Sequence, residues 1–262
     1  MPERDQGPPP TIRAFLAGVS GSGKSYQAWN LYLKRFPRRI LLDQTGEWGY
    51  PNRELNYPGP DLVVETIPQL SWAIKQKAEK GRWTISIETG LDALPELVQY
   101  LIPVPDISRS PIRICHGAVM LVDEVDLVAP PQTARPEVRT LFRRSRHAGL
   151  SIVATTQRPE NVSREVSAQS QQVLCLHLVE PRGLEYMADL MQTDLTELAG
   201  WTKKHPHGGL WYEVRTGRRL WLTESGQLRV PVPTVAAGRP AGEVEAVAEA
   251  GEASEDPPEA SQ

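Results

Sequence analysis

Residues 18–25 have the composition of a loop that binds phosphate groups. They read Gly-Val-Ser-Gly-Ser-Gly-Lys-Ser, which matches the pattern GxxxxGK[ST]. Glycines allow such a loop to bring backbone N–H groups close to a polyphosphate, and the N-terminus of a following helix adds positive potential. Lys24 should reach the β- and γ-phosphates, and the Ser25 hydroxyl should bind Mg²⁺. We therefore predict a site for ATP and Mg²⁺ at Gly18, Ser20, Gly21, Ser22, Gly23, Lys24 and Ser25.

Two adjacent acidic residues, Asp123 and Glu124, follow the apolar run 119–122. Ligands of open α/β sheets bind at the carboxyl ends of the strands, where this acid pair would lie. We expect Asp123 to hold Mg²⁺ through water and Glu124 to polarise the attacking water. An adjacent glutamate suits hydrolysis, whereas a kinase transfers the phosphate to another acceptor and can do without it. The simpler alternative is a solvated strand end.

A third polar segment, Thr156-Gln157-Arg158-Pro159, follows the apolar run 151–155. The strand that precedes it should end beside Asp123, so that Gln157 can sense the γ-phosphate or orient water. Taken alone, the segment is an ordinary strand exit ended by proline. Its significance comes from its place about thirty residues after the acid pair.

The elements that must position these residues are short β-type runs alternating with helical patterns between Thr11 and about Arg229. Several runs are almost unbroken apolar sequence, which is typical of parallel strands covered on both faces. The predicted strands are 12–17, 40–43, 83–88, 119–122, 151–155 and 173–178. Helical spacing appears over 28–36 and over 138–145, the latter ended by Gly149. The segments 210–214 and 218–223 flank Thr216-Gly217 and predict a hairpin at the sheet edge.

The overall composition excludes several classes of protein. Hydrophobic residues make up 40% of the chain and charged residues 23%, and no run approaches the roughly 18 apolar residues of a membrane span. Cys115 and Cys175 are too far apart in sequence for a cysteine-built zinc site, and two cysteines do not make a disulfide scaffold, so a reducing cytoplasm is expected. The N-terminus is polar and Pro-rich, unlike a signal or transit peptide.

Charge is distributed unevenly along the 262 residues. The segment 232–262 has seven acids and one base, a net charge of −6, which leaves +3 for residues 1–231 of a chain that carries −3 overall. This tail contains no aromatic residue and too little apolar surface to offset the entropy of ordering. We predict a disordered segment at 1–10, one nucleotide-hydrolysing domain at 11–231 and an acidic disordered tail at 232–262.

Four segments together resemble the HerA/FtsK superfamily of ring-forming, DNA-pumping ATPases. They are GVSGSGKS at 18–25, LDQTGEW at 42–48, LVDE at 121–124, and ATTQRPENVSREVSAQSQ at 154–171 with its continuation EPRGLEY at 180–186. The resemblance covers roughly residues 12–190 and implies a three-layer α/β P-loop NTPase of the RecA/ASCE-like class, with a mainly parallel central sheet and the C-terminal β-hairpin. It also implies a hexameric or similar ring that threads double-stranded DNA, and it places Asp43 and Glu47 next to the site.

Viral genome-packaging ATPases of this superfamily are often short single-domain chains. We see no sequence for an N-terminal barrel, a membrane anchor or a winged-helix DNA-reading domain, which favours a packaging-type motor. Its expected location is the host cytoplasm, or the virion if the source is viral, and a capsid or membrane-associated protein is a further expected partner.

A helix predicted over 135–147 carries basic residues opposite its apolar stripe: Arg135, Arg139, Arg143 and Arg146. In motors of this kind a neighbouring subunit's arginine commonly completes the site and stabilises charge on the transferring phosphate. We expect Arg143 or Arg146 to do so, and the alternative is a solvated surface helix. Further bases could line a pore and bind DNA phosphates without reading sequence; they are Arg109, Arg113, Lys203, Lys204, Arg218 and Arg219. His205 and His207 are interpreted as loop residues.

Two other functions remain open. One is an assembly ATPase of the phage-morphogenesis or secretion type, which acts on protein partners and would be stimulated by a partner protein or a membrane instead of DNA. The other is a nucleotide or small-molecule kinase, which Asp123-Glu124 together with Gln157 disfavours.

Overall fold

The computed structural model describes residues 11–77, 80–89, 91–102, 116–132, 135–224 and 226–229. Within these ranges the chain forms one sheet with the strand order β10-β9-β8-β7-β1-β6-β5-β2-β4-β3. Its strands are β1 (Arg13–Ala17), β2 (Arg38–Leu42), β3 (Leu62–Val64), β4 (Trp83–Ile87), β5 (Ala118–Val122), β6 (Ser151–Thr156), β7 (Gln172–Cys175), β8 (Gly209–Glu213), β9 (Arg218–Leu222) and β10 (Leu228–Arg229).

The strands from β7 to β3 in this order are parallel, and β8, β9 and β10 extend the sheet in antiparallel fashion beyond β7. Every residue of β4, β5 and β6 is buried, because both faces of the sheet are covered. This explains the unbroken apolar runs in the sequence.

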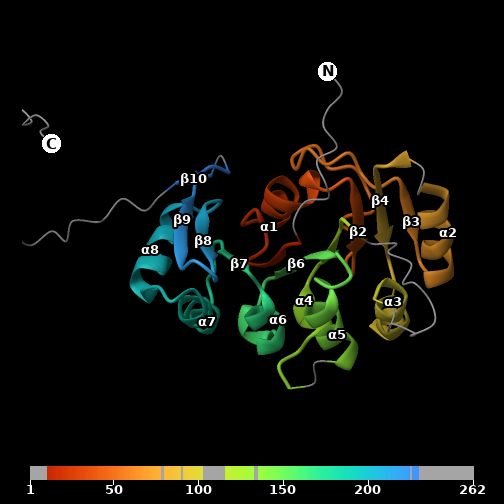
Figure 1. The fold of residues 1–262 in the computed structure, drawn as a ribbon. Helices are drawn as coiled ribbons and strands as arrows, with labels where there is room; N and C mark the ends of the chain where they lie inside the picture. Colours follow the sequence, from red (N-terminus) through yellow and green to blue (C-terminus); the bar gives the residue numbers. More distant parts are fainter. Residues whose placement is uncertain are drawn as a thin grey trace, which may run out of the picture. The chain divides into compact units, whose positions relative to one another are not determined.

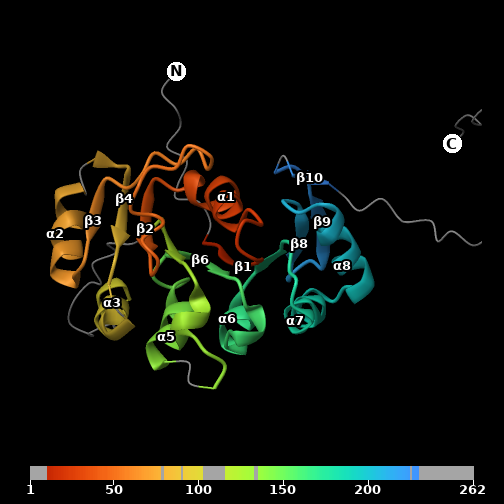
Figure 2. The same ribbon diagram turned by 180° about the vertical axis from the view of Figure 1, so that it is seen from behind.

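Helices cover both faces of the sheet (Figures 1 and 2). One face packs against α2 to α8, with alternate strand residues such as Phe15, Met120 and Ile152 in a single core cluster. The other face packs against the helix that follows β1 and the loop after β2, through a second cluster that includes Leu16, Leu121 and Trp48. The helices are α1 (Lys24–Gln27), α2 (Ile67–Lys77), α3 (Leu94–Leu101), α4 (Val125–Val128), α5 (Pro136–Arg144), α6 (Arg164–Gln169), α7 (Pro181–Met191) and α8 (Leu195–Lys204).

The position of β6 in the sheet determines how the site is assembled. β6 pairs with β1 on one side and with β5 on the other, so the strand that leads to Gln157 separates the phosphate loop from the acid pair. Because the strands are parallel, the residues that follow β1, β5 and β6 all emerge at the same edge. The predicted three-layer α/β class, with its mainly parallel sheet and C-terminal hairpin, is confirmed.

The structure also differs from the sequence prediction in several elements. β3 and β10 were not predicted, because each is only two or three residues long and has no clear apolar alternation. The helix expected over 28–36 begins at Lys24 and continues as a π-helical turn, Ala28–Tyr32, and a 3₁₀ turn, Leu33–Arg35. The helix expected over 135–147 ends at Arg144, so Arg146 lies in the turn that follows it.

Some predictions fall outside the described residues. They concern the segments 1–10 and 232–262, and the bases Arg109 and Arg113. The division of the chain at residues 10 and 231 therefore stays a prediction. Among the described residues, every helix is too short or too polar to cross a lipid bilayer.

Candidate nucleotide-binding site

The phosphate loop joins β1 directly to α1. Gly21 and Gly23 have positive φ angles of 75° and 91°, a backbone conformation that glycine adopts without steric cost. At Gly18 the reason for glycine is space, since a Cβ there would lie 2.5 Å from Ser22 Oγ and 2.8 Å from Leu176 Cβ. The loop is anchored to β6 and to the residue after Leu176, because Gly18 N–H donates to Thr156 O and Val19 N–H to His177 O.

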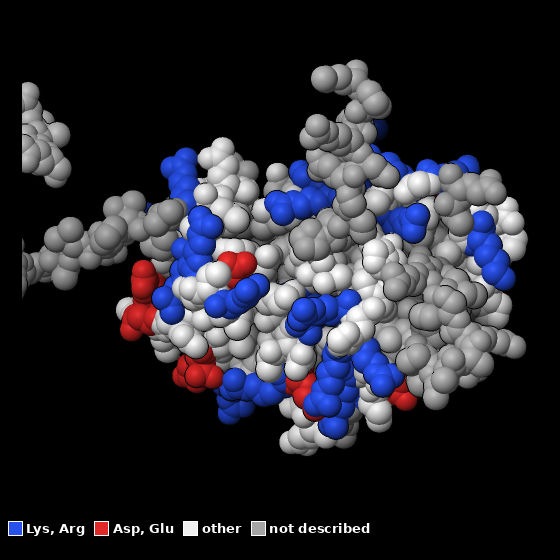
Figure 3. Space-filling view, viewed as in Figure 1, with Lys and Arg blue, Asp and Glu red and all other residues white. Residues whose placement is uncertain are grey.

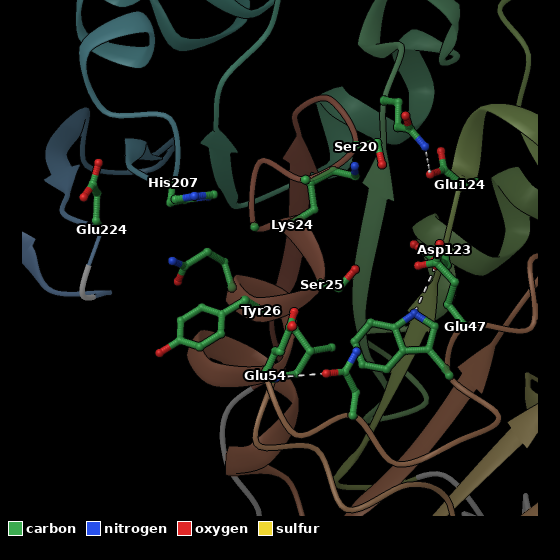
Figure 4. A pocket seen from close by; sticks show the side chains of 17 residues that line it. Ser20, Lys24, Ser25, Tyr26, Glu47, Glu54, Asp123, Glu124, His207 and Glu224 are labelled. Carbon is green, nitrogen blue, oxygen red and sulfur yellow. Dashed lines mark hydrogen bonds between the residues drawn. The ribbon is translucent and has the colours of Figure 1, made fainter.

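Lys24 and Ser25 line a cavity of about 400 Å³ that opens beside the loop. Figure 4 shows both residues on α1, facing Asp123 and Glu124 across the cavity. Lys24 is 7% exposed, and its Nζ donates to Val19 O at 3.2 Å. Burial lowers the pKa of Lys24, and the negative charges of Glu124 and Asp123 oppose that shift. A phosphate group at the loop would also favour the charged lysine.

The Asp123 carboxylate is held by two neighbours. Its Oδ2 accepts a hydrogen bond from Trp48 Nε1 at 3.0 Å, and its Oδ1 accepts a short hydrogen bond from the Thr155 hydroxyl. Burial raises the pKa of Asp123, while both hydrogen bonds lower it. The carboxylate is therefore fixed in orientation at the carboxyl end of β5.

Glu124 and Gln157 are in direct contact. Gln157 Nε2 donates to Glu124 Oε1 at 2.7 Å, which brings together the two residues that the sequence placed on separate strands. Glu124 adopts a left-handed backbone conformation, φ 46° and ψ 57°, which is rare outside glycine and is often retained at functional sites. Burial raises the pKa of Glu124, and the hydrogen bond from Gln157 lowers it.

The loop after β2 supplies the indole that binds Asp123. Asp43 organises this loop, because its Oδ1 accepts from Gly46 N–H at 2.8 Å and its Oδ2 from Trp48 N–H at 2.7 Å. Asp43 thus acts through the backbone of the loop. The resemblance placed Asp43 and Glu47 next to the site, and Trp48 is the aromatic residue that closes the same segment, but no contact between Trp48 and Asp123 was predicted.

Glu47 lies in the same loop and lines the cavity. Burial raises the pKa of Glu47, the nearby charges of Asp123 and Asp43 raise it further, and Lys24 lowers it. Carboxylates gathered in this way suit a hard divalent cation. Among the described residues, no three His, Cys, Asp or Glu side chains converge to hold a metal by themselves. Ser25 and Asp123 both line the cavity, and they are the residues that would hold Mg²⁺ together with phosphate oxygens.

The cavity also contains residues that sequence reasoning missed. His207, interpreted as a loop residue, and Glu224, in the turn between β9 and β10, both line it. Figure 4 shows them on the far side of Lys24 from Glu124. They reach the site because the C-terminal hairpin pairs with β7, the strand next to β1. No local pattern in the sequence indicates this long-range arrangement.

The structure places Arg143 and Arg146 away from this cavity. The parallel strand β6 begins shortly after Arg146 and ends at the cavity, so this arginine lies at the amino-terminal edge of the sheet. Burial lowers the pKa of Arg13 at the start of β1, and the charge of Arg146 lowers it further. Arg143 donates to Glu165 Oε1 at 3.3 Å. Neither arginine serves its own subunit's site, and completion of a neighbour's site stays a prediction.

The predicted DNA-contacting bases lie in different places. Lys203 and Lys204 end α8, close to the start of β8, whereas Arg218 begins β9 at the opposite end of the hairpin. Arg219 is engaged within the fold, since its Nη2 and Nε donate to the carbonyl oxygens of Gln192 and Met191. Lys and Arg side chains are numerous on the face shown in Figure 3.

Comparisons with known proteins agree with the geometry. The family model described as Zonular occludens toxin (Zot) matches residues 102–177, and no curated protein sequence matches the chain. The genome packaging NTPase B204 from Sulfolobus turreted icosahedral virus 2, in complex with ATP-gammaS, is 18% identical over 81% of this chain and 96% of that chain, with a TM-score of 0.56.

Two further solved structures are similar to this chain over most of its length. The B204 NTPase in complex with sulfate has a TM-score of 0.58 at 18% identity, over 85% of this chain and 98% of that chain. VirB4 of Thermoanaerobacter pseudethanolicus has a TM-score of 0.56 at 13% identity, over 85% of this chain and 90% of that chain. Together these likenesses show that the chain has the fold of the P-loop NTPases, as the resemblance predicted.

Proposed function

We propose that this protein is an ATPase that uses Mg²⁺-dependent hydrolysis to translocate double-stranded DNA, as a genome-packaging-type motor. The observation that carries the proposal is the contact between Glu124 and Gln157, which face Lys24 across the cavity. A carboxylate and an amide in this position can bind and orient one water molecule for attack on a phosphate held by the loop. The likeness to the genome packaging NTPase B204 supports a packaging-type function.

Each residue has a defined task in this proposal. Backbone N–H groups of the loop and Lys24 bind the phosphates, Ser25 and Asp123 hold Mg²⁺, and Glu124 withdraws a proton from the attacking water. Gln157 orients that water and senses the γ-phosphate. When bound, Mg²⁺ would supply positive charge that neutralises the phosphate oxygens.

The distribution of charge supports a head-to-tail ring of identical subunits. The carboxyl edge of the sheet carries the acidic residues Glu47, Asp123 and Glu124. It also bears exposed apolar side chains, namely Tyr50 at 74%, Leu127 at 51% and Val179 at 68% exposure. The opposite edge carries the basic turn with Arg146. A neighbour's basic edge is therefore complementary to the nucleotide-binding edge, and we propose that Arg143 or Arg146 completes the site in trans.

The bases proposed to contact DNA are those that remain exposed on the hairpin side, Lys203, Lys204 and Arg218. They can bind phosphates of any sequence, so we expect binding without sequence preference. We also propose that the protein is located in the host cytoplasm or the virion, and that it has a capsid or membrane-associated partner.

A second candidate function is an assembly ATPase of the secretion or phage-morphogenesis type. The match of residues 102–177 to the Zot family model and the likeness to VirB4 favour it. The contact between Glu124 and Gln157 disfavours a kinase. A kinase transfers the phosphate to another acceptor and can do without a glutamate that activates water.

The deciding experiment measures phosphate release from ATP with and without duplex DNA, together with the mass of the protein in solution. Stimulation by DNA of any sequence and a multi-subunit mass support the motor. Hydrolysis that responds only to a protein partner or a membrane supports the assembly ATPase, and phosphate transfer to an acceptor without release overturns both.

A further inference from the structure

The cavity beside the phosphate loop is larger than the phosphates and Mg²⁺ require. Beyond Lys24 and Ser25 it is lined by Tyr26 and Gln27 of α1, by Glu54 and Leu55 of the loop after β2, and by His207 and Glu224 of the C-terminal region. Figure 4 shows Tyr26, His207 and Glu224 on the side of Lys24 that faces away from Glu124. The part of a nucleotide that is not phosphate must lie in this outer half.

Gln27 is the distinctive residue of the outer half. Its side chain is only 1% exposed, yet its Oε1 has no hydrogen-bond partner within the described residues. The turn between β9 and β10 approaches it at Gly226, where a Cβ would lie 3.8 Å from both Gln27 Oε1 and the Tyr26 ring. Buried carbonyl oxygens are nearly always paired. An unpaired oxygen in a cavity wall therefore indicates a donor that arrives with a ligand.

The rest of the outer half is rich in acceptors and in flat or apolar surfaces. Glu54 and Glu224 accept hydrogen bonds when ionised, and no Lys or Arg lines this half of the cavity among the described residues. Tyr26 and His207 offer rings that can contact the face of a planar ligand, and Leu55 adds apolar surface. This combination suits a nucleobase that presents N–H donors at its edge.

We propose that the outer half is a nucleobase subsite in which Gln27 selects adenine through its exocyclic amine. The amine of adenine carries two N–H donors, whereas guanine and hypoxanthine present a carbonyl oxygen at the same position. That oxygen would face Gln27 Oε1, acceptor against acceptor, so 6-oxopurines should bind more weakly than adenine. The inference rests on the proposed function only in requiring a nucleotide at the phosphate loop.

The subsite also connects two parts of the fold. Tyr26 and Gln27 belong to the helix that follows the phosphate loop, whereas His207 precedes β8 and Glu224 follows β9. A bound base would bridge the phosphate-loop helix and the C-terminal hairpin. Discrimination among bases therefore depends on residues that lie about 180 to 200 positions apart in the sequence.

The test measures dissociation constants of the full chain, with Mg²⁺, for ADP, IDP, N6,N6-dimethyl-ADP and inorganic tripolyphosphate. IDP replaces the amine by an oxygen, and the dimethyl analogue removes both donors, so we expect each to bind at least about tenfold more weakly than ADP. Equal affinity for ADP and IDP would overturn the subsite without any variant. Failure of both ADP and tripolyphosphate to bind would instead overturn the phosphate site, and with it the proposed function.

The matched variants are Gln27→Met and Gln76→Met. Gln27→Met keeps the length of the side chain but removes the oxygen, and we expect it to lose the preference for ADP over IDP while tripolyphosphate still binds. Gln76 is exposed on α2, so Gln76→Met should keep the preference. If Gln27→Met binds tripolyphosphate and still prefers ADP, Gln27 does not select the base.

Discussion

The indole N–H of Trp48 donates a hydrogen bond to Asp123 Oδ2 across 3.0 Å, which links the loop after β2 to the acidic end of β5. Trp48 is 1% exposed, and its backbone oxygen accepts a hydrogen bond from the Tyr57 hydroxyl at 2.9 Å. The two rings meet edge to face, 5.3 Å apart. The orientation of the carboxylate proposed to hold Mg²⁺ is thus set by a buried aromatic pair.

Trp48→Phe should reduce Mg²⁺-dependent turnover while leaving the fold intact. Phenylalanine keeps the ring in the core but cannot donate to Asp123. Removing a partner that orients a metal ligand typically costs about 10- to 100-fold in metal affinity or activity. The measurement is ATP turnover as a function of Mg²⁺ concentration, with Trp72→Phe as control because Trp72 is 58% exposed on α2. An unchanged Mg²⁺ dependence would show that the indole is dispensable.

Lys24→Ala and Glu124→Gln should fail in different ways. Lys24→Ala removes a phosphate contact, so both ATP binding and turnover should weaken. Glu124→Gln keeps the size of the side chain but removes the charge that activates water, so ATP should bind and remain uncleaved. Binding of radiolabelled ATP measured alongside phosphate release separates the two cases. Hydrolysis by Glu124→Gln at the parent rate would contradict the assigned mechanism.

Arg146→Ala or Arg143→Ala should abolish turnover without abolishing ATP binding, if that arginine completes a neighbour's site. Such a cation contributes on the order of 10³–10⁵ in rate in other phosphoryl-transfer systems. Arg143 already pairs with Glu165, so Arg146 is the freer of the two for a contact between subunits. Arg144→Ala, in the same exposed stretch, is the matched control.

Mixed rings test whether the arginine acts in trans. Combining the inactive arginine variant with Lys24→Ala subunits pairs some intact phosphate loops with intact arginines across an interface, and phosphate release should return at those sites. Single-turnover phosphate release should be measured as well as steady turnover. If the subunits hydrolyse ATP in strict sequence, steady turnover could fail to reveal the regained activity. A monomer that hydrolyses ATP at full rate at high dilution would exclude the trans contribution.

Removal of residues 232–262 should leave ATP turnover unchanged and tighten DNA binding. The deleted segment carries a net charge of −6, which repels the phosphate backbone. DNA binding itself should weaken steeply with salt, because Lys and Arg contacts with phosphates release counterions. Titrations of both chains at several salt concentrations check this, and a loss of turnover on truncation would contradict a dispensable tail.

The strands and the phosphate-binding residues could be predicted because their signals are local. Ala118–Val122 is apolar throughout, and a strand covered on both faces needs such a run. Asp123 and Gln157 directly follow neighbouring parallel strands, so the meeting of Glu124 with Gln157 follows from fold class and motif together. In contrast, β3 and β10 are short, and they become strands only through pairing with a neighbour.

The outer part of the site could not be predicted from the sequence. Trp48 reaches Asp123 only because Asp43 folds the intervening backbone, which no spacing rule expresses. His207 follows a proline in a polar loop, and Glu224 lies in a hairpin turn, so each looks like an ordinary surface residue. Their shared cavity depends on the hairpin extending the sheet beyond β7. Three-dimensional proximity, and not residue type, identifies them.

The strand β6 has a mechanical consequence for a ring of these subunits. Its six residues are all buried and span about 20 Å, with Gln157 directly after one end. At the other end Arg146 lies in a turn closed by hydrogen bonds from Gly149 N–H to Arg146 O and from Leu150 N–H to Ser145 O. A strand hydrogen-bonded on both sides transmits displacement with little internal deformation. In the proposed ring, movement of Gln157 on loss of the γ-phosphate would shift the arginine offered to the next subunit. Hydrolysis in one subunit would therefore be coupled to hydrolysis in its neighbour.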